Sequence, residues 1–271
     1  MKITFLGGGN MAIALVGGLI QRGFAPHDLS VVEILPEARE RLSAQFAINV
    51  FAEASPESLA CDVLVLAVKP QQMRAALSSL PTGPAKPPLI ISIAAGLLVD
   101  DLARWMKGYR RIVRAMPNTP ALIGAGMTGL YADPSASHED QNRAEAILGA
   151  VGETVWVNNE ALIDSVTAIS GSGPAYVFLF LEAMQEAGRE LGLTAETART
   201  LAIQTVLGAA QLADQSSDPF EILRQRVTSK GGTTEAALKK KAELGVKEGL
   251  IAGMHAAAER SRELGIELGR D

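Results

Sequence analysis

The sequence predicts an α/β domain over residues 1–158 followed by an all-α domain over residues 159–271, and three observations support this division. In the first half, short apolar segments alternate with helical stretches, which is the pattern of a parallel sheet covered by helices. A glycine-rich turn joins the first apolar segment to the first helical stretch. Near Asn158 the pattern changes, and the second half contains long Ala- and Leu-rich stretches with no convincing strand pattern.

Five apolar segments of the first half are predicted to form the strands of the sheet. They are residues 3–6, 29–34, 62–68, 89–93 and 111–115. Residues 11–21 and 36–46 are predicted helices, the second with a proline in its first turn, where proline is well tolerated. Strands that alternate with helices imply parallel pairing, with helices on both faces of the sheet.

The second half is predicted to consist of helices. They cover residues 174–191, 195–213, 219–227, 234–244 and 246–264. Gly192, Asp218 and residues 230–232 mark the breaks between them. Because such long helices need a partner to bury their apolar faces, we expect a homodimer or a larger homo-oligomer.

The charge of the chain argues against a nucleic-acid partner. Its formal net charge is −5 and its isoelectric point is about 5.4, whereas nucleic-acid binders usually carry a basic patch. The one basic run, residues 239–241, is interpreted as a solvated helix face.

Cysteine and histidine usage predicts a cytoplasmic protein without a metal site. Cys61 is the single cysteine, so no disulfide can form within the chain, which fits a reducing compartment. Cys61 is interpreted as a small buried residue and not as a nucleophile. His27, His138 and His255 are too far apart in the sequence to show a metal-ligand spacing.

The hydropathy of the chain predicts neither a signal peptide nor a membrane partner. The apolar segment at the N-terminus is too short for a signal peptide. The longest apolar run, residues 89–99, is interrupted by Ser92 and Gly96, and it is well below the roughly 20 residues of a membrane helix.

The glycine-rich turn predicts a dinucleotide site. Gly7, Gly9 and Ala12 fit the pattern G-x-G-x-x-A between a strand and a helix, which is the context that this motif requires. Gly7 permits the tight turn, and Gly9 lets a pyrophosphate approach the backbone. The free N–H groups of the helix N-terminus attract the phosphates. The first domain is therefore predicted to be a Rossmann-type domain that binds NADPH or NADH.

Glu33 bears on the choice between the two cofactors. It lies at the end of the second predicted strand, where an acidic side chain accepts hydrogen bonds from the adenosine ribose and repels a 2′-phosphate. This favours NADH, although Arg22, Arg39 or Arg41 could offset the repulsion. The alternative is a solvated glutamate at a strand end.

Two further candidates follow strands whose carboxyl ends face the cofactor crevice. Lys69 follows the third predicted strand and could lie beside the nicotinamide ribose or the substrate; alternatively, it is a solvated lysine at a helix start. Asn118 lies in a rigid loop between Pro117 and Pro120 after the fifth strand. It could bind the nicotinamide carboxamide or only shape the turn.

Five segments together resemble the pyrroline-5-carboxylate reductase family, and their order and spacing match along essentially the whole chain. The segments are residues 7–12, 67–71, 114–120, 170–176 and 227–234. The first is shared by many dehydrogenases, whereas the last two are much more specific.

The resemblance implies a Rossmann-type dinucleotide-binding domain followed by an all-α dimerisation domain. It also implies the reduction of 1-pyrroline-5-carboxylate to L-proline with NADPH or NADH, the last step of proline biosynthesis. Family members are often decamers of five dimers, with the small-molecule substrate held near the dimer interface. The residues that the resemblance places on the cofactor are Leu6, Gly7, Gly8, Gly9, Asn10, Met11, Ala67, Val68, Lys69, Pro70, Ala94 and Ala95. Those that it places on the substrate are Ser229, Gly232, Thr233 and Thr234.

The segment at residues 229–234 has a physical reason to bind a carboxylate. Its two glycines let backbone N–H groups point inward, and the helix N-terminus that follows adds partial positive charge. Thr234 could form a hydrogen bond with the ring nitrogen of the imine, which makes it one catalytic candidate. Lys69, at the end of the third predicted strand, is the other. The alternative is that Thr233 or Thr234 is an N-cap.

Three other functions are compatible with parts of this sequence pattern. A hydroxyacid dehydrogenase or a related imine reductase would share the two-domain plan, but the helix predicted at residues 174–191 lacks the lysine that many hydroxyacid dehydrogenases carry. A non-catalytic nucleotide-sensing module would not need a second anion-binding segment such as the one predicted at residues 229–234.

Overall fold

The computed structural model describes residues 1–81 and 87–270. The chain divides into two compact units. The first contains Met1–Ser172 and the C-terminal segment from Ala257 onward, and the second contains Gly173–Ala256. The boundary that the sequence predicts between the α/β domain and the all-α domain, between residues 158 and 159, stays a prediction.

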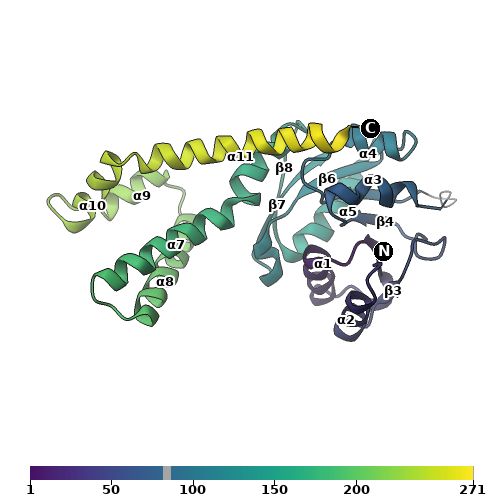
Figure 1. The fold of residues 1–271 in the computed structure, drawn as a ribbon, viewed down its shortest axis with the longest axis horizontal. Helices are drawn as coiled ribbons and strands as arrows, with labels where there is room; N and C mark the ends of the chain where they lie inside the picture. The colour runs from purple at the N-terminus through teal and green to yellow at the C-terminus, as the bar shows by residue number, and fades with distance from the viewer. Residues whose placement is uncertain (82–86, 271) are drawn as a thin grey trace. The chain divides into compact units, whose positions relative to one another are not determined.

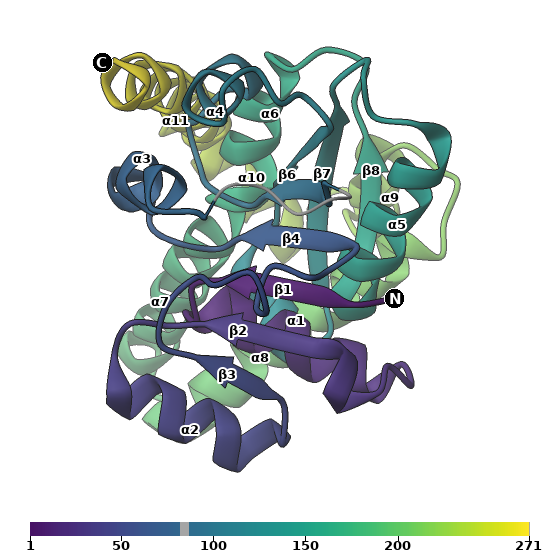
Figure 2. The same cartoon turned by 90° about the vertical axis from the view of Figure 1, so that its right-hand side faces the viewer.

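The first unit is built on one eight-stranded sheet with the order β3-β2-β1-β4-β5-β6-β7-β8. Figure 2 shows β3, β2, β1 and β4 next to one another in this order. All neighbouring strands pair in parallel except β6 and β7, which are antiparallel. The strands are β1 (Ile3–Leu6), β2 (Leu29–Val32), β3 (Asn49–Phe51), β4 (Val63–Leu66), β5 (Leu89–Ser92), β6 (Ile112–Met116), β7 (Gly126–Ala132) and β8 (Gly152–Trp156).

Two apolar clusters in the first unit show that helices cover both faces of the sheet. One cluster joins Phe5 of β1 to Leu15 of α1 and Ile147 of α5. The other joins Leu66 of β4 to Met73 of α3 and Leu102 of α4. The helices are α1 (Asn10–Gln21), α2 (Pro36–Phe46), α3 (Pro70–Ser78), α4 (Val99–Trp105), α5 (His138–Leu148) and α6 (Leu162–Val166). The short turns are η1 (Pro26–Asp28), η2 (Thr119–Ile123), η3 (Gly149–Val151) and the π-helix η4 (Thr167–Gly171).

The strand order reverses its direction at β1, as expected for the predicted Rossmann-type sheet. From β1 the chain builds outward first through β2 and β3, and then on the other side through β4, β5 and β6. Ligands of such sheets bind beyond the carboxyl ends of the strands at this reversal. The turn after β1 and the turn after β4 are therefore adjacent. The predicted Rossmann-type fold is confirmed.

The second unit is entirely helical in the described residues. It contains α7 (Gly173–Glu190), α8 (Ala195–Asp214), α9 (Phe220–Arg226), α10 (Thr233–Glu243) and the first part of α11 (Val246–Gly269). Figure 1 shows α7 and α8 side by side. They approach closely at Gly188, where an added Cβ would lie 2.8 Å from the Cβ of Ala198.

The helices of the second unit leave large apolar side chains exposed. On α7 and α8 they are Val177, Phe178, Leu179, Phe180, Leu201, Ile203, Leu207 and Leu212. Gly188 is the only buried residue of α7. An exposed apolar surface of this size indicates a protein or membrane partner.

Residues Leu162–Glu190 are the one helical run in residues 1–81 and 87–270 that is long and apolar enough to cross a membrane. Only 6% of its most apolar window is buried within the chain. This finding rests on length and composition alone, and a helix covered by a second protein chain has the same composition.

Candidate functional site

The glycine turn after β1 has the geometry of a phosphate-binding loop. Gly7 has a φ of +105°, and an added Cβ would lie 2.8 Å from the carbonyl oxygen of Ala67 at the end of β4. An L-residue with a side chain would therefore be both strained and too close to the backbone of the neighbouring strand. Only glycine allows β1 and β4 to end side by side here.

Gly9 and the start of α1 leave room for an anion. A Cβ on Gly9 would meet no described atom within 4 Å. Gly9 is the N-cap residue of α1, and no side chain of the described residues caps this helix. Its first N–H groups and its positive dipole end are therefore available to a ligand. The loop Leu6–Met11 fits the pyrophosphate of a dinucleotide.

The turn after β4 forms the opposite edge of the crevice. The N–H of Ala67 donates to the carbonyl of Leu6 at 2.8 Å, which extends the sheet pairing up to the turn. Val68 packs against the apolar cluster of α3 and α4. Lys69 is exposed and directly precedes α3, which has Pro70 as its first residue.

The next turn, after β5, contains Ala94 and Ala95. Ala94 is buried, and Gly96, which follows Ala95, has a φ of +82°. The C-terminal end of α11 packs directly against this turn, because an added Cβ on Gly265 would lie 2.5 Å from the carbonyl oxygen of Gly96. The shape of this turn therefore depends on a glycine from the far end of the chain.

Glu33 lies between the glycine loop and the start of α2. The N–H of Gly8 donates to its Oε2 at 2.8 Å, and the N–H of Leu35 donates to its Oε1 at 2.9 Å. The carboxylate is therefore held at the position where an acidic residue meets the adenosine ribose in such domains.

Arg39 lies next to Glu33, and the sequence alone did not single it out from Arg22 and Arg41. Its Nη1 donates to the backbone carbonyls of Glu33 and Ile34, both at 2.8 Å. Its other N–H groups are free in the part of the chain that the structure describes. A cation is thus fixed beside the carboxylate that would face the 2′-position of a bound nucleotide.

Asn118 has its side chain inside the protein, with 9% exposed. Its Oδ1 accepts the N–H of Met127 at 2.9 Å, and its Nδ2 donates to the carbonyl of Ser170 at 3.0 Å. The amide thus joins the end of β6 to β7 and to the π-helix η4. This link could not be predicted from the sequence, because Ser170 is 52 residues away.

The predicted substrate segment lies in the second unit and starts α10. Gly232, and neither threonine, is the N-cap residue of α10. The hydroxyls of Thr233 and Thr234 bond no other group in the described chain, so both can reach a ligand. Gly231 has a φ of +74°, and its N–H donates to Oε2 of Glu235 at 2.7 Å.

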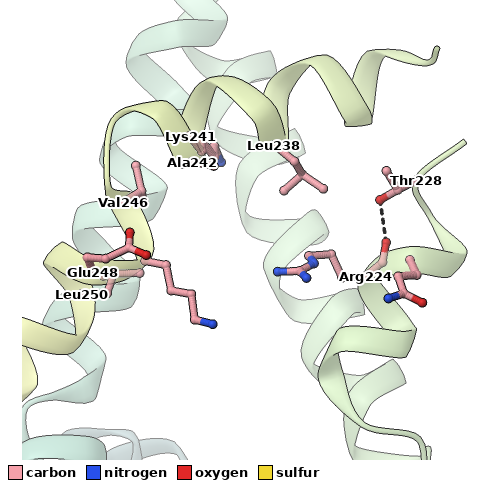
Figure 3. A pocket seen from close by; sticks show the side chains of 10 residues that line it. Arg224, Thr228, Leu238, Lys241, Ala242, Val246, Glu248 and Leu250 are labelled. Carbon is pink, nitrogen blue, oxygen red and sulfur yellow. Dashed lines mark hydrogen bonds between the residues drawn. The ribbon is translucent and has the colours of Figure 1, made fainter. Parts of the chain in front are cut away.

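A pocket of about 530 Å³ lies beside this segment, between α9, α10 and the start of α11. Figure 3 shows Arg224, Leu238, Lys241 and Leu250 among its lining side chains. Its nearest lining residue in sequence is Thr228, just before the substrate segment, and the hydroxyl of Thr228 donates to the carbonyl of Arg224. The residues predicted to bind substrate therefore do not line this pocket.

Neither a metal centre nor a reactive thiol is evident. The described residues contain no group of three or more His, Cys, Asp or Glu side chains that could hold a metal ion. Burial raises the pKa of the Cys61 thiol, which keeps it protonated and unreactive.

Two family models match the chain. Residues 160–264 match a model described as pyrroline-5-carboxylate reductase dimerisation. Residues 2–96 match a model described as NADP oxidoreductase coenzyme F420-dependent.

Whole-chain comparisons agree with these matches. A pyrroline-5-carboxylate reductase of Pseudomonas aeruginosa is 45% identical over 99% of this chain and 98% of its own length. One of Haemophilus influenzae is 41% identical over 97% of each chain. Among solved structures, a pyrroline-5-carboxylate reductase of Coxiella burnetii is 42% identical, with a TM-score of 0.90 and 97% and 98% of the two chains covered. A pyrroline carboxylate reductase of Plasmodium falciparum with NADP bound is 29% identical, with a TM-score of 0.86 and 98% of each chain covered.

Proposed function

Since this chain belongs to the pyrroline-5-carboxylate reductase family, we propose which of its residues carry out the reaction of that family. The chain is an oxidoreductase that reduces the C=N bond of 1-pyrroline-5-carboxylate to give L-proline with NAD(P)H. The match over the whole length of the relatives favours this activity over a hydroxyacid dehydrogenase or a nucleotide sensor.

The observation that carries the proposal is the open, uncapped start of α1 at Gly9, next to the turn after β4. We assign the pyrophosphate to the loop Leu6–Met11 and the nicotinamide half to the turns after β4 and β5. The cofactor-binding residues of these turns are Ala67, Val68, Lys69, Pro70, Ala94 and Ala95.

Glu33 and Arg39 bear on the choice between NADH and NADPH, and we propose a preference for NADH. The carboxylate of Glu33 is fixed by the N–H groups of Gly8 and Leu35, so it cannot easily turn away from a 2′-phosphate. Arg39 lies close enough to pair with such a phosphate and to make NADPH a usable second cofactor. Both cofactors should therefore work, with NADH the better one.

The substrate carboxylate is assigned to the segment Ser229–Thr234. The backbone N–H groups near Gly232 and the positive end of α10 favour an anion. The hydroxyl of Thr234 donates to or accepts from the ring nitrogen, and Lys69 supplies positive charge near the nicotinamide. The bound nicotinamide supplies the hydride, while the protein orients the imine and excludes water.

Thr234→Val tests the substrate assignment, because valine has the shape of threonine without the hydroxyl. We expect kcat/KM for the imine to fall about 100-fold, as for the loss of a hydrogen bond made in the transition state. Thr205→Val is the control, since Thr205 is exposed on α8 and bonds only the carbonyl of Leu201. Wild-type kcat/KM in Thr234→Val would refute the assignment.

The remaining properties concern the assembly and its place in the cell. The dimerisation model over residues 160–264 shows that the chain forms oligomers. We propose a homodimer that can assemble further into a decamer, without nucleic acid or a membrane as partner. The single cysteine fits a reducing compartment, and we propose a cytoplasmic enzyme.

A further inference from the structure

The side chain of Asn118 connects three parts of the first unit that are distant in sequence. It projects from the loop after β6, accepts a hydrogen bond from β7 and donates one to η4. Asn118 is only 9% exposed, so its amide has lost most of its hydrogen bonds to water. The two bonds within the protein replace them, and leaving either amide atom without a partner would be costly. This position requires both a donor and an acceptor.

The segment that Asn118 holds is a π-helical turn. In η4 the N–H of Ser172 donates to the carbonyl of Thr167 at 2.8 Å, which is the i to i+5 bond of a π-helix. Such turns are rare and occur frequently at functional sites. The turn is packed tightly at Gly171, where an added Cβ would lie 2.7 Å from Cε of Met116.

The turn is therefore fixed at the carboxyl end of β6. Met116 is the last residue of β6, and Asn118 follows it by two residues. Strands β4, β5 and β6 follow β1 on one side of the sheet and form the second mononucleotide-binding half. In such sheets this half binds the nicotinamide part of the cofactor, and the half around β1 and β2 binds the adenosine part. The π-turn thus lies at the edge of the sheet to which the nicotinamide half of the cofactor is assigned.

We propose that Asn118 is a positioning residue that acts through Ser170. Its amide holds η4 against the end of β6, and η4 in turn fixes the side of the crevice next to the nicotinamide. This inference rests on the cofactor placement proposed above. It assigns to Asn118 an effect on the hydride step and not on cofactor affinity, because small misplacements of reacting groups slow a reaction strongly.

Asn118→Asp tests this role with almost no change of shape. The carboxylate still accepts the N–H of Met127, but it cannot donate to the carbonyl of Ser170, and it brings a negative charge next to that oxygen. Asn159→Asp is the matched control. Asn159 is exposed, and its Oδ1 accepts only the N–H of Ala161, which an aspartate can also accept.

The measurements are kcat, the Kd of the reduced cofactor from its fluorescence, and the primary isotope effect with cofactor deuterated at the transferred position. For Asn118→Asp we expect kcat to fall at least 10-fold, the isotope effect to rise, and Kd to stay within about threefold of wild type. Asn159→Asp should match wild type in all three.

An unchanged kcat and isotope effect in Asn118→Asp would overturn the proposal. A Kd weakened 10-fold with kcat unchanged would also overturn it, in favour of direct contact between Asn118 and the cofactor. If Asn118→Asp does not fold, Gly171→Val decides, because it displaces the same turn and should lower kcat selectively. A wild-type chain that binds no reduced nicotinamide would contradict the proposed cofactor site itself.

Discussion

At the scale of single residues, Glu33 binds the glycine loop and is the residue that we propose to influence the choice of cofactor. Its position at the end of a strand, 24 residues after Gly9, was enough to predict a role at the ribose. Its bonds to the N–H groups of Gly8 and Leu35 could not be predicted, because they depend on the path of the loop.

Glu33→Gln should shift the enzyme towards NADPH. Glutamine can still accept the N–H of Gly8, but it no longer repels a 2′-phosphate, and Arg39 remains beside it. We expect the ratio of kcat/KM for NADPH to kcat/KM for NADH to rise about 10-fold, which corresponds to roughly 1.4 kcal/mol. Glu37→Gln, an exposed change in the first turn of α2, should leave the ratio unchanged. An unchanged ratio in Glu33→Gln would exclude Glu33 as the determinant.

Asp140 is a residue whose charge stabilises the first unit. Hydrogen bonds from Arg111 to its carboxylate hold the pKa of Asp140 at about 2, against an ordinary value of 3.8. Because this pKa is lowered in the folded state, the stabilisation is complete above about pH 4 and is lost as the pH falls towards 2.

Asp140→Asn should therefore lower the free energy of unfolding by roughly 2 kcal/mol at neutral pH. The difference from wild type should shrink as the pH is lowered from about 4 to 2, as urea unfolding at several pH values would show. Glu139→Gln, next to it on α5 but with a side chain that is 71% exposed, should have little effect at any pH. A difference that does not depend on pH would contradict the assigned cause.

At the scale of elements, apolar runs predicted the central strands, while edge and glycine-rich strands were missed. The five predicted strands are all present within two residues of their predicted ends. β3 has three residues at the sheet edge, and β8 alternates between exposed and half-buried positions. β7 contains Gly126 and Gly129, which lower its strand propensity.

The glycines of β7 have a packing reason that the sequence does not show. An added Cβ on Gly129 would lie 2.5 Å from Cγ1 of Val166 in α6, and one on Gly126 would lie 2.9 Å from the carbonyl oxygen of Val151. The antiparallel pairing of β7 was also missed, because alternating strands and helices predict only parallel neighbours.

The packing of α1, which carries the predicted pyrophosphate site, can be tested with two adjacent glycines. An added Cβ on Gly18 would lie 2.7 Å from the carbonyl oxygen of Ala150, whereas one on Gly17 would meet only the ring of Phe46 at 3.4 Å. Gly18→Ala should destabilise the protein by about 1–3 kcal/mol. Gly17→Ala should be neutral or stabilising by up to about 1 kcal/mol. Equal effects in denaturant unfolding would contradict this description of the contact.

At the scale of the whole molecule, the second unit exposes apolar helix faces that a partner subunit would cover in an oligomer. Its helices were predicted closely from their helical spacing, and α7 leaves Phe178 65% exposed and Leu179 63% exposed. The number of subunits does not follow from the sequence pattern, because an apolar face shows that a partner is needed but not how many copies assemble.

Phe178→Asp should dissociate the oligomer, since a carboxylate would be buried in an apolar interface. Sedimentation velocity should show a smaller species, with activity reduced at least 10-fold at the same chain concentration. Val155→Asp, an equal change at a 43% exposed position on β8, should leave the mass unchanged. A wild-type mass for Phe178→Asp would show that this face is not the interface.

The central claim is that the site after β1 and β4 presents NAD(P)H to a cyclic imine. The most direct measurement is steady-state turnover of 1-pyrroline-5-carboxylate, followed as oxidation of NADH and NADPH in parallel, with a panel of 2-ketoacids as alternative substrates. We predict imine-dependent oxidation of both cofactors, proline as product, a higher kcat/KM with NADH, and no turnover of ketoacids. Absence of imine-dependent oxidation with either cofactor, or faster turnover of a ketoacid, would contradict the account.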